Sequence, residues 1–579
     1  MTPPTLDFRN VNALWGSVLV ETLARLGVRT AVISPGSRST PLTFAFAQHP
    51  QIDAVPVLDE RSAAFFALGL ARRQRRAVVL LCTSGTAGAN YFPAVIEAQE
   101  SGVPLLVITA DRPPEMRDCG SGQTIDQQKL FGGHVNFYHE LAVPMATLPM
   151  MVYLRQTVAH AFERTRSPAT GPVHLNAPFR DPLPPTQDES ASSLTGAINE
   201  TFFSHLNQPF PQSSQSTIWQ RPTTARGLIV AGPVTIEDSS AYVRKAIELS
   251  TNLGWPILAD GLSPLRSHTQ AVESIITTYD AILRDPTLAR DLVPRTVLCL
   301  GAWPTSRVLR GWLETFGGEV LLVSPVAANR DALHGRTRQI VAPVESLAVA
   351  GDGVGDPTYV RQWARAERAG RAALDSEMER ESGMFEPKAV WLLARNLPQG
   401  SAIFVASSMP VRDLEYFWPA NGRCQTIYFN RGANGIDGTL STALGIAHAG
   451  TATVLLTGDL ALLHDANGFM LKPKFRGSLT IVLINNRGGG IFEHLPIAEF
   501  APTFEEYFAT PQEVDFEKLC GAHAIEHVLI RDWAHFSEVV SILPAAGIRV
   551  LEVRTDRKHD AARRKQMFLT VAAAARSAH

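Results

Sequence analysis

The sequence predicts an α/β protein made of three domains, each built on a parallel β-sheet. Apolar, β-branched runs of strand length alternate with helix-length segments along most of the chain. With 579 residues, the chain is also too long for a single hydrophobic core. A stretch rich in Pro, Ser, Gln and Thr (181–224) and a glycine-rich stretch (349–356) separate three blocks. We therefore expect an amino-terminal domain over 1–185, a linker over 186–225, a central domain over 226–350 and a carboxyl-terminal domain over 351–579.

The individual elements follow from the same patterns. In the first block we expect strands at Thr30–Ile33, in the apolar runs 77–82 and 103–110, and an amphipathic helix after Pro149. The second block has strand-like runs at 226–233, 256–260 and 296–301. The third begins with a charged helix over 359–380 and contains buried strands at Thr453–Thr457 and Leu479–Ile484. The basic residues between Arg557 and Lys565 are typical of a solvated helix face.

Composition favours a cytoplasmic enzyme. The formal net charge of −2 gives no electrostatic reason to expect nucleic acid or an anionic membrane as partner. The five cysteines are scattered, which fits a reducing compartment and argues against a cysteine zinc site. The amino terminus lacks the basic and then apolar start of a secretion signal. The apolar runs are shorter than the ~18 residues that a membrane helix needs, so no membrane insertion is expected.

Two strand ends carry the ligands of a predicted metal and diphosphate site. Gly458-Asp459 follows the first strand and Asn485-Asn486 the second, with the aspartate and the second asparagine 27 positions apart. Ligands bind at this edge of open α/β sheets. Mg²⁺ prefers oxygen ligands, which the Asp459 carboxylate, the Asn486 amide and the Gly488 carbonyl would provide beside phosphate oxygens and water. The alternative is two ordinary strand-end turns, since Asp and Asn are common in turns.

At these residues the chain resembles the thiamine diphosphate enzymes, which hold their cofactor through Mg²⁺ by a Gly-Asp segment ending in Asn-Asn. Leu460 replaces a common third glycine. The resemblance implies a glutamate that hydrogen-bonds the aminopyrimidine ring and promotes proton removal from the thiazolium carbon. Glu60 matches it, although it could instead only favour a helix start capped by Asp59. It further implies these cofactor contacts: Glu60, Ser408, Met409, Gly435, Ile436, Gly458, Asp459, Leu460, Asn486, Gly488 and Ile491.

Further stretches are similar to one branch, the 2-succinyl-5-enolpyruvyl-6-hydroxy-3-cyclohexene-1-carboxylate (SEPHCHC) synthases of menaquinone or phylloquinone biosynthesis. They lie at 34–43, 82–87, 109–127, 407–413 and 430–438, and the match is weakest over 187–380. The implied reaction decarboxylates 2-oxoglutarate and adds the succinyl semialdehyde carbanion to isochorismate. Both substrates carry two carboxylates, which arginines bind in a bidentate manner. The implied substrate contacts are Ser37, Arg38, Arg112, Gln123, Arg307, Ser408, Arg412, Arg431 and Phe492.

Within that set we assign Arg412, Ser408 and Arg431 to 2-oxoglutarate, and Arg38, Arg112, Gln123 and Arg307 mainly to isochorismate or the adduct. Any one arginine could instead be a solvated loop charge. Ile436 matches the apolar residue that supports the bent cofactor, or is an ordinary core residue. Gly122, Ala461 and Gly490 depart from residues seen in some relatives. The resemblance also implies a homodimer or homotetramer, with Mn²⁺ as an alternative to Mg²⁺.

Three other functions stay open. Another thiamine diphosphate enzyme, such as an acetolactate synthase or a 2-oxoacid decarboxylase, would share the cofactor residues. A dinucleotide-dependent oxidoreductase would share the sheets, but no convincing G-x-G-x-x-G follows the first strand, where Gly36 stands alone. A catalytically silent relative is disfavoured by Glu60.

Overall fold

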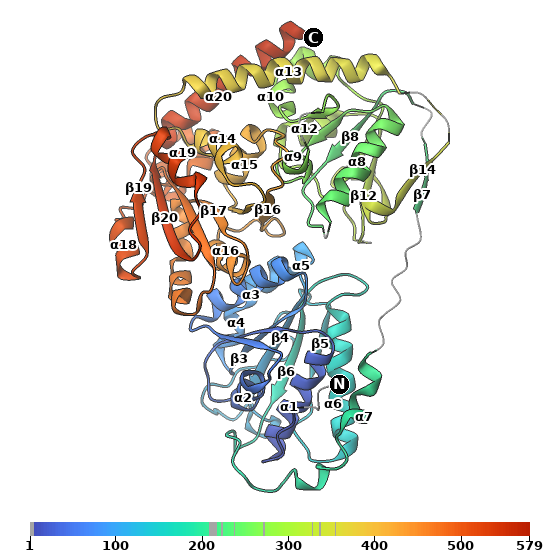
Figure 1. The fold of residues 1–579 in the computed structure, drawn as a ribbon, viewed down its shortest axis with the longest axis vertical. Coiled ribbons are helices and arrows are strands. Elements are labelled where there is room, and N and C mark those ends of the chain that lie inside the picture. Colours follow the sequence, from blue (N-terminus) through green and yellow to red (C-terminus); the bar gives the residue numbers. More distant parts are fainter. Residues whose placement is uncertain are drawn as a thin grey trace. The chain divides into compact units, whose positions relative to one another are not determined.

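The computed structural model describes residues 5–207, 217–221, 224–236, 238–269, 272–326, 328–334, 337–351, 353 and 355–579. Three six-stranded sheets dominate it, and all of their strand pairs are parallel (Figure 1). The predicted α/β class with three parallel sheets is therefore confirmed. Among the described residues, no helix combines the length and the apolar character needed to cross a bilayer.

The first sheet has the strand order β2-β1-β3-β4-β6-β5. Alternate residues of its strands, such as Leu81 and Ile108, pack with Trp15, Phe46 and Leu154 from the helices that cover one face. Helix α3 contacts strands β1, β3 and β4 as well. The strands are β1 (Thr30–Ile33), β2 (Asp53–Pro56), β3 (Val78–Cys82), β4 (Leu105–Asp111), β5 (Phe137–Glu140) and β6 (Val173–Pro178). The helices are α1 (Val11–Arg25), α2 (Thr40–Gln48), α3 (Glu60–Gln74), α4 (Thr86–Asn90), α5 (Phe92–Ser101), η1 (Pro114–Met116) and α6 (Leu148–Arg164).

The compact unit that contains this sheet also includes 430–450 and 461–477, two segments from the predicted carboxyl-terminal domain. They contribute α16 (Thr439–Ala447) and the 3₁₀ helix η5 (Ala466–Lys474). Helix α16 packs on α3 and on η5. We call this assembly the first unit. The second unit comprises 212–429, 451–460 and 478–579.

The second sheet, with the order β10-β9-β8-β11-β12-β13, has apolar side chains on both faces. Ile229 and Leu298 pack on one face with α8, while Leu228 and Val297 pack on the other with α12 and Trp363. Its strands are β8 (Gly227–Ala231), β9 (Ile257–Ala259), β10 (Ile275–Ile276), β11 (Thr296–Leu300), β12 (Glu319–Ser324) and β13 (Thr337–Val341). Its helices are α8 (Ser239–Leu253), α9 (Leu265–His268), α10 (Tyr279–Ile282), α11 (Pro286–Asp291), α12 (Arg307–Thr315) and η4 (Val344–Ser346).

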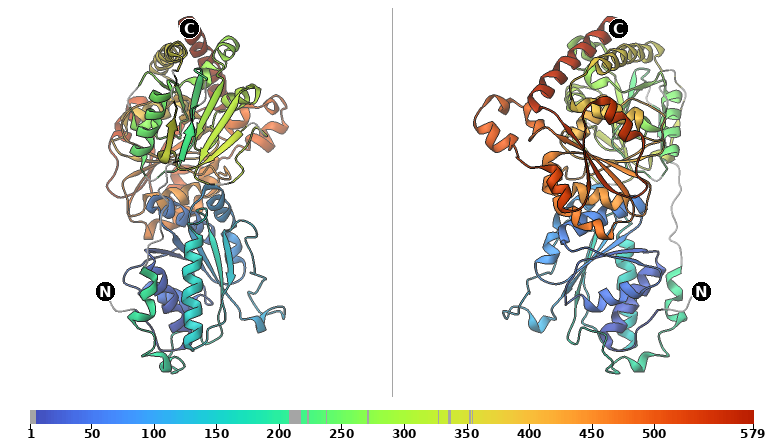
Figure 2. Two further views of the ribbon diagram at one scale, coloured as in Figure 1. Left: turned by 90° about the vertical axis from the view of Figure 1, so that its right-hand side faces the viewer. Right: turned by 60° about the vertical axis from the view of Figure 1, so that its left-hand side comes forward.

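The third sheet, with the order β16-β15-β17-β18-β20-β19, carries the predicted metal ligands. Helices α13 and α20 of the second unit pack against each other, and the right-hand view of Figure 2 shows both as long helices. The strands are β15 (Ala402–Val405), β16 (Thr426–Phe429), β17 (Thr453–Gly458), β18 (Ser478–Asn485), β19 (Glu526–Leu529) and β20 (Gly547–Arg554). The helices are α13 (Pro357–Arg380), α14 (Glu386–Asn396), α15 (Met409–Phe417), α17 (Asp459–His464), η6 (Gly490–His494), η7 (Pro496–Glu499), the π-helical η8 (Glu505–Ala509), α18 (Phe516–Ala522), α19 (Trp533–Ser541) and α20 (Arg557–Ala578).

The predicted linker has structure of its own. Its described amino-terminal part forms η2 (Ser192–Leu194), α7 (Glu200–Phe203) and η3 (Ser204–Asn207), and Phe202 and Phe203 are buried in the core of the first unit. Farther along, β7 (Thr217–Gln220) pairs in parallel with β14 (Leu347–Ala350). Residues 208–216 and 222–223 of the predicted linker lie outside the described residues.

Candidate active site

Adjacent strands of the third sheet bring the predicted metal ligands to one edge. Strands β17 and β18 pair in parallel, with Gly458 opposite Ile484. Asp459, directly after β17, is therefore level with Asn485, one residue before Asn486. The Asp459 side chain is only 3% exposed. Its two oxygens accept hydrogen bonds from the backbone N–H groups of Leu460 (2.8 Å) and Gly488 (2.9 Å), which fix the carboxylate at the strand ends.

The polar atoms of this edge fit a bound cation. Burial raises the pKa of Asp459 to about 6, so the charged carboxylate is costly there without a positive partner. The Asn486 amide nitrogen donates to Glu386 Oε2 over 2.9 Å, whereas the amide oxygen is buried and has no hydrogen-bond partner. Gly488 has a φ of +136°, and a Cβ there would lie 2.4 Å from the Ala509 carbonyl oxygen, so only glycine permits this turn.

A buried ionic cluster begins at Glu386, the residue to which the Asn486 amide donates. Arg564, 2% exposed, donates to Asp413 through two nitrogens (2.8 and 3.0 Å) and to Glu386 Oε1 (2.7 Å). Burial raises the pKa of Asp413 well above its usual range, and burial together with the Glu386 charge raises that of Asp560 to about 8.

The expectation of a solvated basic face on the last helix was wrong at three positions. Arg557 pairs with Glu493 (2.8 Å) and with Glu505, and Arg563 pairs with Glu377 (3.0 Å) and Glu381 (2.8 Å). Arg564 is buried in the cluster just described. The physical reason is that α20 is packed on other elements: α13 and its carboxyl end supply the acids for Arg563, η6 and η8 supply those for Arg557, and α14 and α15 supply those for Arg564.

Glu60 is the first residue of α3 in the first unit. Asp59 caps this helix by accepting from the backbone N–H groups of Arg61 (2.9 Å) and Ser62 (3.3 Å). The cap that sequence reasoning offered as the alternative is therefore present. It places Glu60 in the first turn, where the helix dipole favours a carboxylate. A cofactor contact of Glu60 stays a prediction.

Sequence reasoning missed Glu97, which holds the loop that contains Arg431, Gly435 and Ile436. Its buried carboxylate accepts from the backbone N–H groups of Gly432 (3.1 Å) and Ala433 (2.7 Å) and pairs with Arg72 (2.9 Å). A cavity of about 140 Å³ lies here, lined by Phe65, Glu97, Gly435 and others. No local signal distinguishes Glu97 from an ordinary helix-surface glutamate, because its partners lie far away in the sequence.

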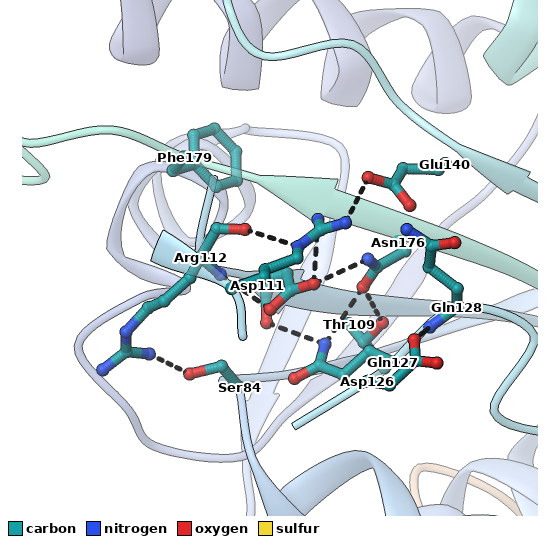
Figure 3. Close-up of polar contacts among 12 residues, drawn as sticks. Ser84, Thr109, Asp111, Arg112, Asp126, Gln127, Gln128, Glu140, Asn176 and Phe179 are labelled. Carbon is teal, nitrogen blue, oxygen red and sulfur yellow. Dashed lines mark hydrogen bonds and ion pairs between the residues drawn. The ribbon is translucent and has the colours of Figure 1, made fainter. Parts of the chain in front are cut away.

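Three predicted substrate residues gather at the carboxyl ends of β3 and β4 in the first unit. Arg112 donates to the Ser84 hydroxyl, and the Gln123 amide donates to the Ser84 carbonyl oxygen (3.0 Å). Figure 3 shows Arg112 reaching Ser84, beside a buried polar network around Asp111 and Asn176. Arg38 donates to the Phe179 carbonyl oxygen (3.0 Å). Burial lowers the pKa of Arg38, and the charge of Arg112 lowers it further, so these two guanidinium groups lie within electrostatic reach.

A second pair of predicted substrate arginines lies in the second unit. Arg412 donates to the Ser408 carbonyl oxygen (2.6 Å), and Ser408 has a φ of +74°, which is rare for serine. Burial lowers the pKa of Arg412, and the charge of Arg307 at the start of α12 lowers it further. Met409 is buried at the first position of α15, while Ile491 and Phe492 lie in η6 after the glycine turn. Ser37 is exposed in the loop after β1.

The three parallel sheets, with an acid and an amide at adjacent strand ends and a separate helix-initiating glutamate, match the pattern predicted for a thiamine diphosphate enzyme, and comparison with known proteins shows that class. The profile described as "Thiamine pyrophosphate enzyme, N-terminal TPP binding domain" matches residues 15–130, and "Middle domain of thiamine pyrophosphate" matches 199–405. A solved structure of a thiamin diphosphate-dependent enzyme from Mycobacterium smegmatis shares the fold, with a TM-score of 0.64 and 16% identity over 94% of this chain and 99% of the other.

Curated relatives narrow the class. The SEPHCHC synthase of Trichodesmium erythraeum is 50% identical over 96% of this chain and 98% of its own length. That of Trichormus variabilis is 51% identical over 98% and 99%. The chain therefore belongs to the SEPHCHC synthase family, whose members form a carbon–carbon bond in quinone biosynthesis and depend on thiamine diphosphate. The predicted family is thus confirmed.

Proposed function

We propose that this chain decarboxylates 2-oxoglutarate and joins the remaining four-carbon unit to isochorismate, giving SEPHCHC and CO₂ for menaquinone or phylloquinone synthesis. One observation carries the proposed cofactor site: the buried, unpartnered Asn486 amide oxygen near the desolvated Asp459 carboxylate. A Mg²⁺ ion, or Mn²⁺ in its place, would give the amide oxygen a partner and offset the charge of the carboxylate while binding a diphosphate.

Each residue of the proposed site has a defined task. Asp459, Asn486 and the Gly488 carbonyl would hold the metal, and the backbone of Gly458 and Leu460 would lie along the diphosphate. Bound thiamine diphosphate supplies the nucleophilic carbon and the electron sink for decarboxylation. Glu60 would accept a hydrogen bond from the aminopyrimidine and control its protonation. Ile436, with Gly435, Ser408, Met409 and Ile491, would hold the two rings in a bent conformation.

The arginines would select dicarboxylates. Arg412, Ser408 and Arg431 would bind the distal carboxylate of 2-oxoglutarate, while Arg38, Arg112, Gln123 and Arg307 would bind mainly isochorismate or the adduct. Ser37 would be a further polar contact, and Ile491 and Phe492 would form an apolar wall. The grouping of Arg112 and Gln123 on Ser84, with Arg38 in electrostatic reach, supports the second assignment. Asp181 lies 3.8 Å from Arg38 and offsets part of this charge, whereas Arg112 donates to a neutral hydroxyl, so the pair of guanidinium groups still favours an anionic ligand.

The metal assignment predicts that Asp459→Ala abolishes Mg²⁺-dependent binding of thiamine diphosphate, because a methyl group cannot offset the charge of the ion. Calorimetric titration measures it. Asp515→Ala, which removes an exposed acid that caps α18, is the control and should keep wild-type affinity. If the folded Asp459→Ala protein binds the cofactor normally, the metal site is wrong. Product analysis with 2-oxoglutarate or pyruvate, with and without isochorismate, separates the proposed reaction from acetolactate synthesis or simple decarboxylation.

We further propose a homodimer, or a dimer of dimers, in which Glu60 of one chain and Asp459 of another act on the same cofactor. Two inactive variants would then complement each other. Random mixing of Glu60→Ala and Asp459→Ala chains makes about half of the dimers mixed, each with one intact site of two, which gives about a quarter of wild-type activity. Mixed dimers purified with two different tags give the measurement. If they are folded, mixed and inactive, each site is built within one chain.

A further inference from the structure

We propose that Glu386 is a positioning residue that turns the Asn486 amide so that its oxygen, and not its nitrogen, faces the cation. The inference rests on the proposed metal site, and it assigns a role to a residue that is 100 positions away in the sequence. An amide is nearly symmetric in shape, so a ligand asparagine works only if a neighbour fixes which end points at the ion.

The contacts of Glu386 impose that choice. Its Oε2 accepts from the Asn486 amide nitrogen over 2.9 Å, and its Oε1 accepts from Arg564 over 2.7 Å. An ionised carboxylate has no proton to donate, so the amide must present its NH₂ group to it. The amide oxygen then points away, and it is the atom that is buried and unpartnered.

The surrounding structure holds Glu386 in place. It begins α14, is 3% exposed, and its backbone N–H points at the Asp560 carboxylate (3.4 Å). Arg564 is itself fixed by its two bonds to Asp413. Gly490 leaves room for the amide, since a Cβ there would lie 2.8 Å from the Asn486 amide nitrogen. Every atom that determines the amide orientation therefore belongs to the second unit.

A competing explanation is that Glu386 only balances the charge of Arg564. Substituting Glu386 alone, and then Glu386 together with Asn486, distinguishes this explanation from the positioning role. In Glu386→Gln, the guanidinium of Arg564 can only donate and takes the new amide oxygen. The NH₂ group of the introduced glutamine then faces Asn486, which must turn its oxygen inward and present its own NH₂ group to the metal. Adding Asn486→Asp restores a matched pair, because the introduced carboxylate accepts from the glutamine NH₂ group and still offers an oxygen to the ion.

The test measures Mn²⁺ affinity by the electron paramagnetic resonance signal of free Mn²⁺, with thiamine diphosphate present and circular dichroism to verify folding. Glu386→Gln should weaken Mn²⁺ binding by about 10–100-fold, the usual effect of losing an outer-shell partner. The double variant should return to within about threefold of wild type. Asn486→Asp alone should also weaken binding, although it adds a charge at the ligand, because two carboxylates then face each other.

Asp413→Asn is the control for the Arg564 cluster, since the introduced amide keeps an oxygen that can accept from Arg564, and Asp413 is not the hydrogen-bond partner of Asn486. It should change Mn²⁺ affinity by less than about threefold. The proposal is overturned if Glu386→Gln binds normally, if the double variant is no better than Glu386→Gln, or if Asp413→Asn is equally damaging. If Glu386→Gln does not fold, the single variant Asn486→Asp provides the test. Mn²⁺ binding by this variant that is as tight as that of wild type, or tighter, refutes the role of Glu386. Equal Mn²⁺ binding by wild type and Asp459→Ala would instead refute the metal site itself.

Discussion

Helices α3 and α16 cross at two glycines, and this crossing gives a quantitative prediction. A Cβ on Gly445 would lie 2.2 Å from the Phe66 carbonyl oxygen, 2.9 Å from the Leu70 nitrogen and 3.0 Å from the Gly69 Cα. All three are backbone atoms, so no side chain can move aside. Because α3 begins at Glu60 and α16 follows Ile436, the crossing also ties together two elements that carry predicted cofactor contacts.

The change Gly445→Ala should destabilise the first unit by about 2 kcal/mol. An ordinary C···O contact is about 3.3 Å, so the helices must separate by about 1 Å. Overpacking costs about 1–3 kcal/mol, and contact with rigid backbone favours the upper end. Alanine offsets about 1 kcal/mol of this by its better helix propensity. For a unit of some 250 residues, the melting temperature should fall by about 4–8 °C.

Differential scanning calorimetry of the full chain measures the effect, with each transition followed separately because a multidomain protein need not unfold in one step. Gly311→Ala is the matched control, since Gly311 lies inside α12 with nothing within 4 Å of an added Cβ. It should gain up to about 1 kcal/mol from helix propensity alone. A loss of stability in Gly445→Ala together with a gain in Gly311→Ala supports the predicted clash. If Gly445→Ala is as stable as Gly311→Ala, the close approach of the helices is wrong.

Three further predictions concern individual side chains. Glu60→Gln should keep the fold but slow deuterium exchange at the thiazolium carbon by about 10²-fold or more, and wild-type exchange would count against the role of Glu60. Arg412→Ala should weaken 2-oxoglutarate far more than pyruvate in steady-state kinetics; equal losses would make Arg412 structural. Burial raises the pKa of Asp465 from 3.8 to about 7, so its contribution to stability is full below about pH 4 and is lost as the pH rises through 7. Asp465→Asn should therefore gain about 2–3 kcal/mol relative to wild type between pH 5 and pH 8, and a difference independent of pH would contradict that shift.

The strands and the ends of the strands could be predicted from the sequence because their signals are local. A strand buried on both faces needs consecutive apolar residues, which is why Thr453–Thr457 and Leu479–Ile484 were found close to the observed β17 and β18. Parallel pairing then brings Asp459 and Asn486 to one edge without further information. The same reasoning identified β1, β8, β11 and the long helix α13.

The boundaries of the units could not be expressed as contiguous ranges. The segments 430–450 and 461–477 belong to the same compact unit as the amino-terminal sheet, because the Gly445 face of α16 packs against α3. Composition marks where linkers run along the chain, but it carries no information on which helix faces match. The close approach of the Thr442 carbonyl to Gly69, where an added Cβ would lie 2.1 Å from that oxygen, is visible only once both helices are placed.

The ionic cluster around Arg564 shows why basic residues of one helix can be assigned to solvent in error. In the sequence, Arg563, Arg564 and Lys565 are consecutive charges, which is typical of an exposed face. The helix turns Arg564 toward Glu386, 178 positions earlier, and Asp413, 151 positions earlier. A buried arginine needs carboxylates to offset its desolvation, and those carboxylates in turn need a reason to be buried. If Glu386 positions Asn486, the burial of these charges has a function: Asp413 holds Arg564, Arg564 holds Glu386, and Glu386 fixes the direction of the Asn486 amide. Replacing such a cluster by apolar residues can preserve stability, but it would leave the amide free to turn its nitrogen toward the metal.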